Sequence, residues 1–203
     1  MGANMDFIIL FEYLGMFMFA FSGAVVGREE DFDFLGIAIL SITTALGGGI
    51  LRDVIVNSQS PYALSNYLPY IVIALGMTTA LKFKKIQDNF WVIALDAIGL
   101  AAFTVSAGIN AINAGYNCIT VIFCCFLSAV GGGIIRDIMV NRKPYVFQKD
   151  IYAITSVEGA LIIFCLKDVF SNELLILISF IIVFGTRMMC YIKHISLPVF
   201  SES

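Results

Sequence analysis

The sequence predicts an all-α membrane protein with seven transmembrane helices, arranged as a 3+3 inverted repeat plus one extra helix. Three observations lead to this prediction. The chain is 60% hydrophobic and 13% charged, with a mean hydropathy of +0.93, whereas soluble proteins average about 45–50% and about 25%. Apolar runs of about 17–25 residues, long enough to cross a bilayer, recur along the chain. A segment of thirteen residues also occurs twice, 84 positions apart.

The seven helices are expected in the apolar runs, with short polar loops between them. In chain order they are about Phe7–Val26, Phe34–Val56, Tyr67–Phe83, Phe90–Asn110, Cys118–Val140, Ile151–Leu166 and Leu174–Ile192. The first three form repeat one, about residues 6–83, and the next three form repeat two, about residues 90–167. The seventh, about residues 174–192, belongs to neither. No segment is polar or long enough for a separate soluble domain, so we expect one membrane domain over residues 1–203.

The repeat is clearest in the second and fifth helices. Residues 45–57 read ALGGGILRDVIVN and residues 129–141 read AVGGGIIRDIMVN, with nine identities in thirteen positions. The alignment extends upstream without a gap, matching Glu12 with Asp96, Gly15 with Gly99, Phe19 with Phe103 and Ser22 with Ser106. Because each copy holds three helices, an odd number, the second copy must enter the membrane from the opposite face. Many transport proteins have this arrangement.

Each copy of the motif places three consecutive glycines, Gly47, Gly48 and Gly49 or Gly131, Gly132 and Gly133, near the middle of a helix. A helical glycine costs about 1 kcal/mol relative to alanine, so we expect a bend or a break. Backbone groups left unpaired by a break must be buried in protein or line a water-filled cavity. An arginine, Arg52 or Arg136, follows the glycines in each copy. A hinge beside an ion pathway is therefore the favoured interpretation. Close helix packing through small residues is the alternative. Valine at Gly48 or Gly132 is expected to leave a folded protein with reduced permeation.

Ionisable residues occur inside the predicted spans, where an unpaired charge costs at least about 2.5–3.5 kcal/mol. They are Glu12, Arg52, Asp53, Asp96, Arg136, Asp137, Glu158 and Arg187. We expect two cross-helix pairs, Glu12–Arg52 and Asp96–Arg136, flanking the glycines. Asp53 and Asp137 are the main rival partners of the two arginines. However, Arg52 cannot readily pair with its neighbour Asp53, because successive helical residues point about 100° apart. Glu158 stands where repeat one has Ala74, and Arg187 is its candidate partner.

Hydroxyl groups offer a possible polar lining, although each is individually more typical of helix packing. They are Ser22, Ser41, Thr43, Thr44, Ser106 and Ser128. The five cysteines lack metal-ligand spacing and are interpreted as small packing residues. No metal, cofactor or nucleic acid is expected, and His194 receives no role.

Basic residues predict the orientation. With seven spans, one side receives Arg28, Lys82, Lys84, Lys85, Arg142, Lys143, Lys149 and Lys193, and the other only Lys167. The richer side is therefore expected to be cytoplasmic, which places the N-terminus outside and the C-terminus inside the cell membrane. No basic residue precedes the first apolar run, which argues against a cleaved signal peptide.

The residues of both motif copies, with Ala20-Phe-Ser-Gly23 and Arg187…Leu197-Pro198, resemble the prokaryotic trimeric intracellular cation (TRIC) channel family over nearly the whole chain. The resemblance implies a homotrimer in the lipid bilayer and one pathway per protomer for potassium and, less selectively, sodium, between the bent second and fifth helices. Bacterial relatives are also associated with glycine uptake.

Three function classes follow. The first is a cation channel gated at the glycines, and the second is a secondary carrier of glycine or another small zwitterion, whose repeats rock around a midplane site. The third is an intramembrane enzyme, which the sequence disfavours because it has no histidine within a span and no metal-ligand spacing.

Overall fold

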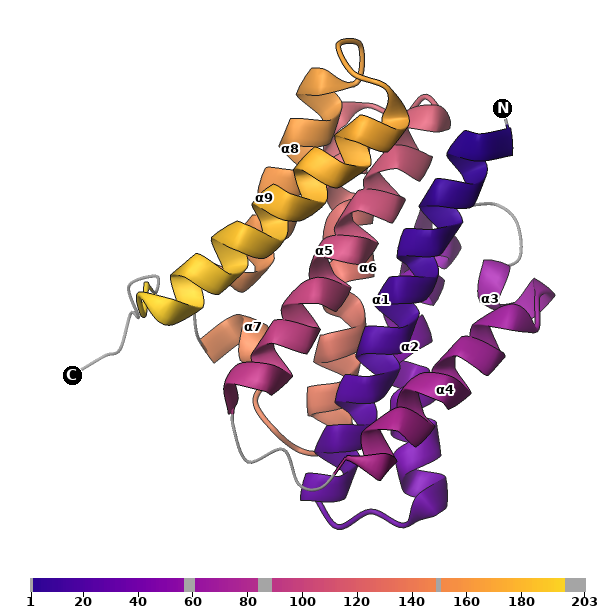
Figure 1. Cartoon of the computed structure of the whole chain (residues 1–203), viewed down its shortest axis with the longest axis vertical. Coiled ribbons are helices and arrows are strands. Elements are labelled where there is room, and N and C mark those ends of the chain that lie inside the picture. The colour runs from indigo at the N-terminus through magenta and orange to yellow at the C-terminus, as the bar shows by residue number, and fades with distance from the viewer. Residues whose placement is uncertain (1, 57–60, 84–88, 149–150, 196–203) are drawn as a thin grey trace.

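The computed structural model describes residues 2–56, 61–83, 89–148 and 151–195, and these ranges contain helices and short connections but no strand (Figure 1). The helices are α1 (Gly2–Glu29), α2 (Phe34–Val56), α3 (Tyr62–Ser65), α4 (Leu68–Lys82), α5 (Asn89–Asn113), α6 (Cys118–Met139), α7 (Tyr145–Gln148), α8 (Tyr152–Leu166) and α9 (Asn172–Ile192). The motif residue Asn57, the loop residues Lys84, Lys85 and Lys149, and the Leu197-Pro198 pair lie outside the described residues.

All seven predicted helices are present, as α1, α2, α4, α5, α6, α8 and α9. Five of them, all but α4 and α8, are long and apolar enough to cross a membrane. The helices α4 and α8 have 15 residues each, which at about 1.5 Å per residue falls short of a hydrocarbon core about 30 Å thick. The short helices α3 and α7, each of which follows a motif helix, were not predicted from the sequence.

Helix boundaries recur at the spacing of the sequence repeat. The motif helices α2 and α6 begin at Phe34 and Cys118, which are 84 residues apart. The shorter helices α4 and α8 begin at Leu68 and Tyr152, which are also 84 residues apart. Side-chain caps recur too: Asp33 Oδ1 accepts a hydrogen bond from the Gly36 amide at 2.7 Å, and Asn117 Oδ1 accepts one from the Thr120 amide at 3.0 Å. Such caps satisfy amides that have no partner inside the helix. The two motif helices therefore start by the same local mechanism.

The turns before these caps also correspond. Asp31 has φ of 54° and Gly115 has φ of 77°, and they occupy matching positions of the two repeats. This left-handed conformation suits glycine, and aspartate adopts it more readily than most residues. Both repeats therefore reverse the chain with the same tight turn.

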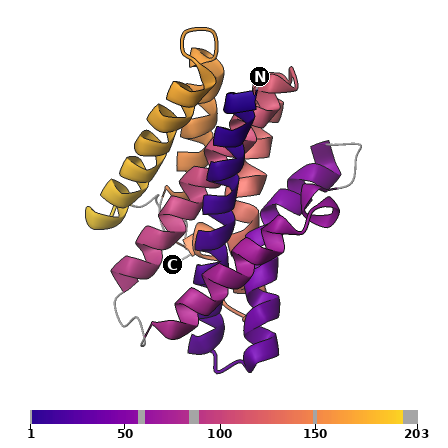
Figure 2. The same cartoon turned by 45° about the vertical axis from the view of Figure 1, so that its right-hand side comes forward.

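The helices α1 and α5 run side by side through the middle of the molecule, with α2 to α4 on one flank and α8 and α9 on the other (Figures 1 and 2). The helix α1 packs against α2, α4 and α5, while α5 packs against α1, α6, α8 and α9. The motif helices α2 and α6 also pack directly against each other. Each repeat thus contributes its first helix to the centre and its motif helix to a shared contact.

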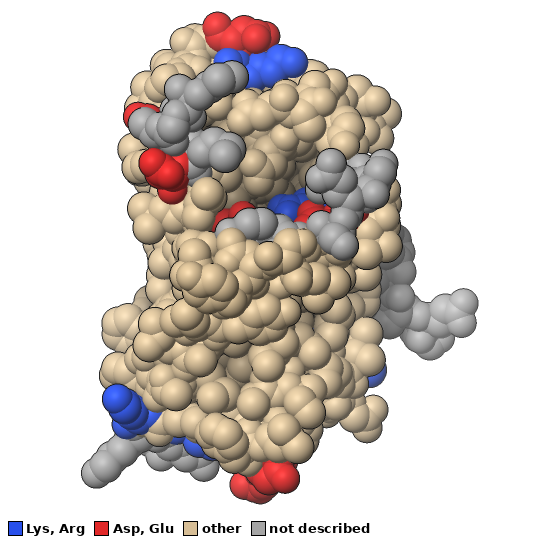
Figure 3. Space-filling model, turned by 90° about the vertical axis from the view of Figure 1, so that its right-hand side faces the viewer, with Lys and Arg blue, Asp and Glu red and all other residues tan. Residues whose placement is uncertain are grey.

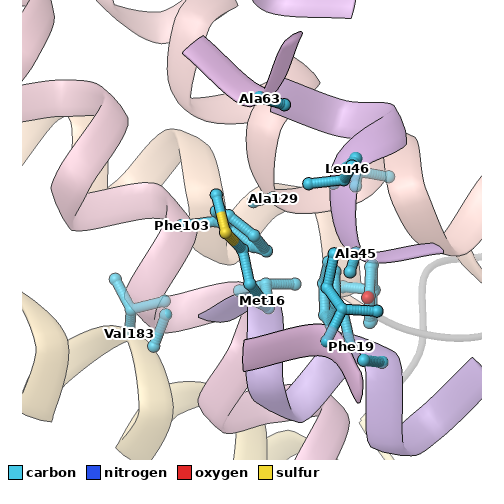
Figure 4. Close-up of a cluster of buried hydrophobic side chains, with 14 residues drawn as sticks. Met16, Phe19, Ala45, Leu46, Ala63, Phe103, Ala129 and Val183 are labelled. Atoms are coloured by element: carbon cyan, nitrogen blue, oxygen red, sulfur yellow. The ribbon is translucent and has the colours of Figure 1, made fainter. Parts of the chain in front are cut away.

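The central contact between α1 and α5 is reciprocal. The rings of Phe19 and Phe103 lie 5.1 Å apart between centroids, and each ring covers a glycine of the opposite helix, Phe103 over Gly15 and Phe19 over Gly99. Close-up views place Phe103 beside Met16 in the same buried cluster (Figure 4). Because a glycine receives each ring, the two helices approach closely without leaving a void.

Candidate functional site

Buried charged side chains form two clusters, one from each repeat. The first cluster consists of Glu12, Arg52 and Asp53, and the second consists of Asp96, Arg136 and Asp137. All six residues are at most 9% exposed. Charges are buried only when other groups compensate them, so their partners determine what each cluster can do.

In the first cluster, Arg52 reaches both acids. Its Nη2 atom lies 3.6 Å from Glu12 Oε1 on α1 and 2.7 Å from Asp53 Oδ1. Arg52 Nε donates a hydrogen bond to the same Asp53 oxygen at 2.8 Å. Arg52 Nη1 is buried and has no hydrogen-bond partner among the described residues.

In the second cluster, Arg136 is bonded more completely. Its Nη1 atom donates to Ser22 Oγ at 2.6 Å and to Asp96 Oδ1 at 3.2 Å. Its Nε and Nη2 atoms both lie 2.9 Å from Asp137 Oδ1, and the other oxygen of Asp137 accepts the Tyr145 amide at 2.9 Å. The second cluster therefore ties α1, α5, α6 and the start of α7 together.

The structure contains both cross-helix pairs that the sequence predicts, Glu12–Arg52 and Asp96–Arg136. The expectation that Arg52 cannot readily pair with the neighbouring Asp53 was wrong. The guanidinium group is long and flexible enough to fold back, and in both copies Nε and Nη2 contact the neighbouring aspartate. Each arginine thus pairs both with the acid on the other helix and with the neighbouring aspartate.

The glycines do not break their helices. Both α2 and α6 continue through Gly47–Gly49 and Gly131–Gly133 without interruption. A Cβ atom on Gly48 would lie 2.5 Å from the Ser128 carbonyl oxygen, and one on Gly132 would overlap the carbonyl oxygen of Thr44. The predicted break was therefore wrong, and the alternative interpretation, close helix packing through small residues, describes the contact. The crossing is antiparallel, since the earlier residue of one helix meets the later residue of the other.

The predicted polar lining is only partly associated with the clusters. Ser22 bonds Arg136, whereas Thr44 and Ser106 donate to carbonyl groups of their own helices, at 2.6 Å and 3.3 Å. Ser128 Oγ and Ser41 Oγ are buried without a hydrogen-bond partner among the described residues, and Thr43 bonds the Ile39 carbonyl oxygen at 2.8 Å.

Arg187 packs against aromatic rings rather than pairing with Glu158. Its guanidinium carbon lies 4.7 Å from the centroid of Tyr152 and 5.5 Å from that of Tyr145. Glu158 instead accepts a hydrogen bond from Thr186 at 3.3 Å. The candidate Glu158–Arg187 pair was therefore wrong, because the cation is held over the π faces of two tyrosines.

Tyr152 and Cys124 were not among the predicted site residues. Tyr152 is 3% exposed and forms a side-chain hydrogen bond to Asp96, which adds it to the second cluster. Leu68 occupies the matching position of repeat one, so this departure from the internal symmetry was the available signal. Cys124 interacts electrostatically with Arg52 and Asp53, and its matching residue is Leu40.

An exposed ion-pair network joins the two repeats at the C-terminal end of α1 and just after α6. Arg142 Nε donates to Glu30 Oε1 at 2.7 Å, and its Nη1 and Nη2 atoms each donate to Glu29 Oε2 at 3.2 Å. The arginine side chain is 41% exposed, so water and salt screen these pairs strongly.

We expect the Arg142→Gln substitution to lower the free energy of unfolding by less than about 1 kcal/mol at low ionic strength. The loss should disappear at about 1 M salt, where the Debye length is about 3 Å. Thermal melting of both proteins at the two salt concentrations measures this difference. An equal loss at high salt would show that packing of the arginine stem, and not its charge, stabilises this loop contact.

A family model described as glycine transporter matches the chain twice, at residues 9–84 and 93–168, so both edges of the match are separated by 84 residues. The membrane protein YvgT of Bacillus subtilis is 37% identical over 157 residues, covering 76% of this chain and 78% of the relative. The inner membrane protein YadS of Escherichia coli is 27% identical over 196 residues, covering 94% of both chains.

Solved structures share the fold. A TRIC cation channel studied for its conductance is 31% identical, with a TM-score of 0.86 over 96% of this chain and 97% of the channel. A TRIC orthologue from Rhodobacter sphaeroides superposes with a TM-score of 0.85 over 93% of this chain and 98% of its own, at 23% identity. These structures are channels rather than enzymes.

Proposed function

The chain belongs to the glycine transporter family of membrane proteins, and from this membership and its TRIC fold we propose that it is a monovalent cation channel. The observation that carries the proposal is the match to a TRIC cation channel at 31% identity over nearly the whole of both chains. By this analogy the protein forms a homotrimer with one potassium-permeable pathway in each protomer.

The two buried clusters support a pathway through the protomer. Each contains two acids and one arginine, so each is net negative when ionised. They lie on the two sides of the glycine crossing, with Arg52 after Gly48 on α2 and Arg136 after Gly132 on α6, where the helices are antiparallel. Acidic groups of this kind attract cations. We propose that ions pass both clusters and that the tight crossing between them is the gate.

We further propose that the two halves form an inverted repeat of three spans each, in which the 15-residue helices α4 and α8 are the short third spans, with α9 as the seventh span. The antiparallel crossing of α2 and α6 and the matching helix boundaries support this arrangement. The distribution of basic residues favours an external N-terminus and a cytoplasmic C-terminus.

Purified protein in planar bilayers under a potassium gradient tests the channel proposal. We expect discrete unitary currents that reverse near the potassium equilibrium potential. Silent bilayers, together with saturable counterflow of labelled glycine in liposomes, would overturn the proposal in favour of a carrier.

Cys124 offers a native probe of the pathway, because its thiol interacts electrostatically with Arg52 and Asp53 of the first cluster. Its neighbour Cys125 provides the control. Both thiols are buried and both interact electrostatically with Arg52. The Cys124 thiol also interacts with Asp53, whereas the Cys125 thiol donates to the Thr104 carbonyl oxygen at 3.3 Å. We expect silver ions, which are small monovalent cations that bind thiols, to block the wild-type and Cys125→Ser channels and to spare Cys124→Ser. If Cys124→Ser is blocked as fully as the wild type, ions do not pass the first cluster.

The second candidate function is a glycine carrier, which the description of the matching family favours. An alternating-access carrier would need the crossing of α2 and α6 to open on one side at a time. The bilayer and counterflow measurements described above separate the two candidates.

A further inference from the structure

Arg187, on α9, is buried against two aromatic rings that lie beside the second cluster. The arginine is 1% exposed, and its guanidinium carbon is closer to the centroid of Tyr152, at 4.7 Å, than to that of Tyr145, at 5.5 Å. The two rings also contact each other edge to face, with centroids 6.2 Å apart. The cation and the two rings therefore form one buried stack that joins α7, α8 and α9.

Each tyrosine of this stack also bonds an acid of the second cluster. Tyr152 forms a side-chain hydrogen bond to Asp96, and the Tyr145 amide donates to Asp137 Oδ2 at 2.9 Å. Both acids in turn contact Arg136. A cation over the π face draws electron density from the ring, which strengthens the Tyr152 hydroxyl as a donor. Contacts therefore run without a gap from α9 to the arginine of the motif helix α6.

Repeat one cannot build the same stack. Pro61 occupies the position of Tyr145, and Leu68 occupies that of Tyr152. Proline has no amide hydrogen to donate, and leucine has neither a π face nor a hydroxyl. The helix α9 lies outside both matches to the family model and packs against α5 and α8 of repeat two. All three components of the stack are thus specific to the second cluster.

The surroundings of the two clusters differ accordingly. A Cβ atom on Gly133 would lie 3.6 Å from the Tyr152 hydroxyl oxygen and 4.0 Å from Arg136 Nη2, whereas one on Gly49 would have nothing within 4 Å among the described residues. On the face that carries α3 and α4, Figure 3 shows a hollow with basic and acidic atoms in its depth. Among the described residues, the buried charged side chains of α1 to α4 are those of the first cluster. The stack therefore covers only one of the two clusters.

We propose that Arg187 is a positioning residue of the second cluster, because its cation holds both tyrosines where they bond the two acids. The seventh helix thereby fixes the charges on one side of the glycine crossing and not on the other. This deepens the proposed function, on which only the consequence for ion flow rests. A pathway with a tightly held cluster at one end and a less tightly bonded cluster at the other conducts unequally in the two directions.

Hydrogen–deuterium exchange of the detergent-solubilised protein, resolved at the Tyr145 amide, tests the positioning role. Arg187→Met keeps the length of the side chain but removes its cation, and we expect this amide to exchange at least about tenfold faster. Arg187→Lys keeps a cation at the rings and should restore most of the protection. The matched control is Thr186→Val, which removes the bond from Thr186 to Glu158 at the same contact of α8 with α9. It should leave the exchange of the Tyr145 amide unchanged.

The coupling between Asp96 and Arg136, measured by a double-mutant cycle, distinguishes positioning from a general loss of stability. In the Arg187→Met background this coupling should fall to less than about half, while the coupling of the cross-helix pair in the first cluster stays unchanged. Tyr152→Phe keeps the ring but removes the hydroxyl. In a Tyr152→Phe background, Arg187→Met should therefore have no further effect on the coupling.

The proposal is overturned if Arg187→Met leaves both the exchange and the coupling as in the wild type, or if Thr186→Val changes them as much. In planar bilayers, the ratio of unitary currents at equal and opposite potentials should change in Arg187→Met and not in Thr186→Val. An unchanged ratio would overturn the consequence for ion flow. Silent bilayers from every protein would overturn the channel proposal, whereas the exchange and coupling measurements need no ion flow and still decide the role of Arg187.

Discussion

Replacing Gly132 with alanine is expected to destabilise the protein by about 3 kcal/mol, the upper part of the range for overpacked cores. The added methyl group would overlap the Thr44 carbonyl oxygen. Backbone of a continuous helix cannot move aside locally, so α2 and α6 would have to separate. Thermal melting followed by size-exclusion chromatography of detergent-solubilised protein measures the loss. Gly48→Ala should behave similarly, because its methyl group would lie 2.5 Å from the Ser128 carbonyl oxygen.

Gly49→Ala is the matched control from the same motif. An added Cβ atom there has nothing within 4 Å among the described residues, and alanine favours the helix by about 1 kcal/mol. This variant should be as stable as the wild type or slightly more stable. If Gly132→Ala and Gly49→Ala melt alike, the close crossing does not stabilise the fold. The structure thus revises the expectation that valine at Gly48 or Gly132 leaves a folded protein with reduced permeation.

Replacing Arg136 with glutamine is expected to cost about 3–5 kcal/mol of stability, the usual loss when one partner of a buried ion pair is removed. The substitution leaves Asp96 and Asp137 buried without their cation. Arg52→Gln should cost less, because it also removes the donor at Nη1 that has no acceptor among the described residues. Denaturation of the two variants side by side measures the difference between the repeats.

A double-mutant cycle identifies the pair itself. Asp96→Asn combined with Arg136→Gln should destabilise by less than the sum of the single changes, with a coupling of about 1 kcal/mol or more. Strictly additive losses, or equal losses for Arg52→Gln and Arg136→Gln, would contradict the assignment of the second cluster as the more tightly bonded of the two.

Much of this fold could be predicted from local features of the chain. Apolar runs located seven helices, the two shortest of which, α4 and α8, have 15 residues each. The starts of α2 at Phe34 and of α6 at Cys118 agree with the prediction, and Asp33 and Asn117 cap these helices through nearby amides. The short helices α3 and α7 were missed because four residues give too little periodicity to detect. The repeated motif identified four charged residues of the clusters, and the alignment upstream of it added Glu12 and Asp96, since ionisable groups inside apolar spans must be compensated.

The sequence by itself therefore determined the membrane class, the duplication and the identity of the buried charges, all of which depend on composition and spacing along one chain. Only the tertiary structure decided how these parts are used. The glycines are contact points and not breaks, because a second helix lies against them. Arg187 packs against two tyrosine rings and does not pair with Glu158. Arg136 Nη1 donates two hydrogen bonds, whereas Arg52 Nη1 has no acceptor among the described residues. These outcomes depend on distances between residues far apart in the chain, and on side-chain reach within the packed interior, which no local pattern encodes.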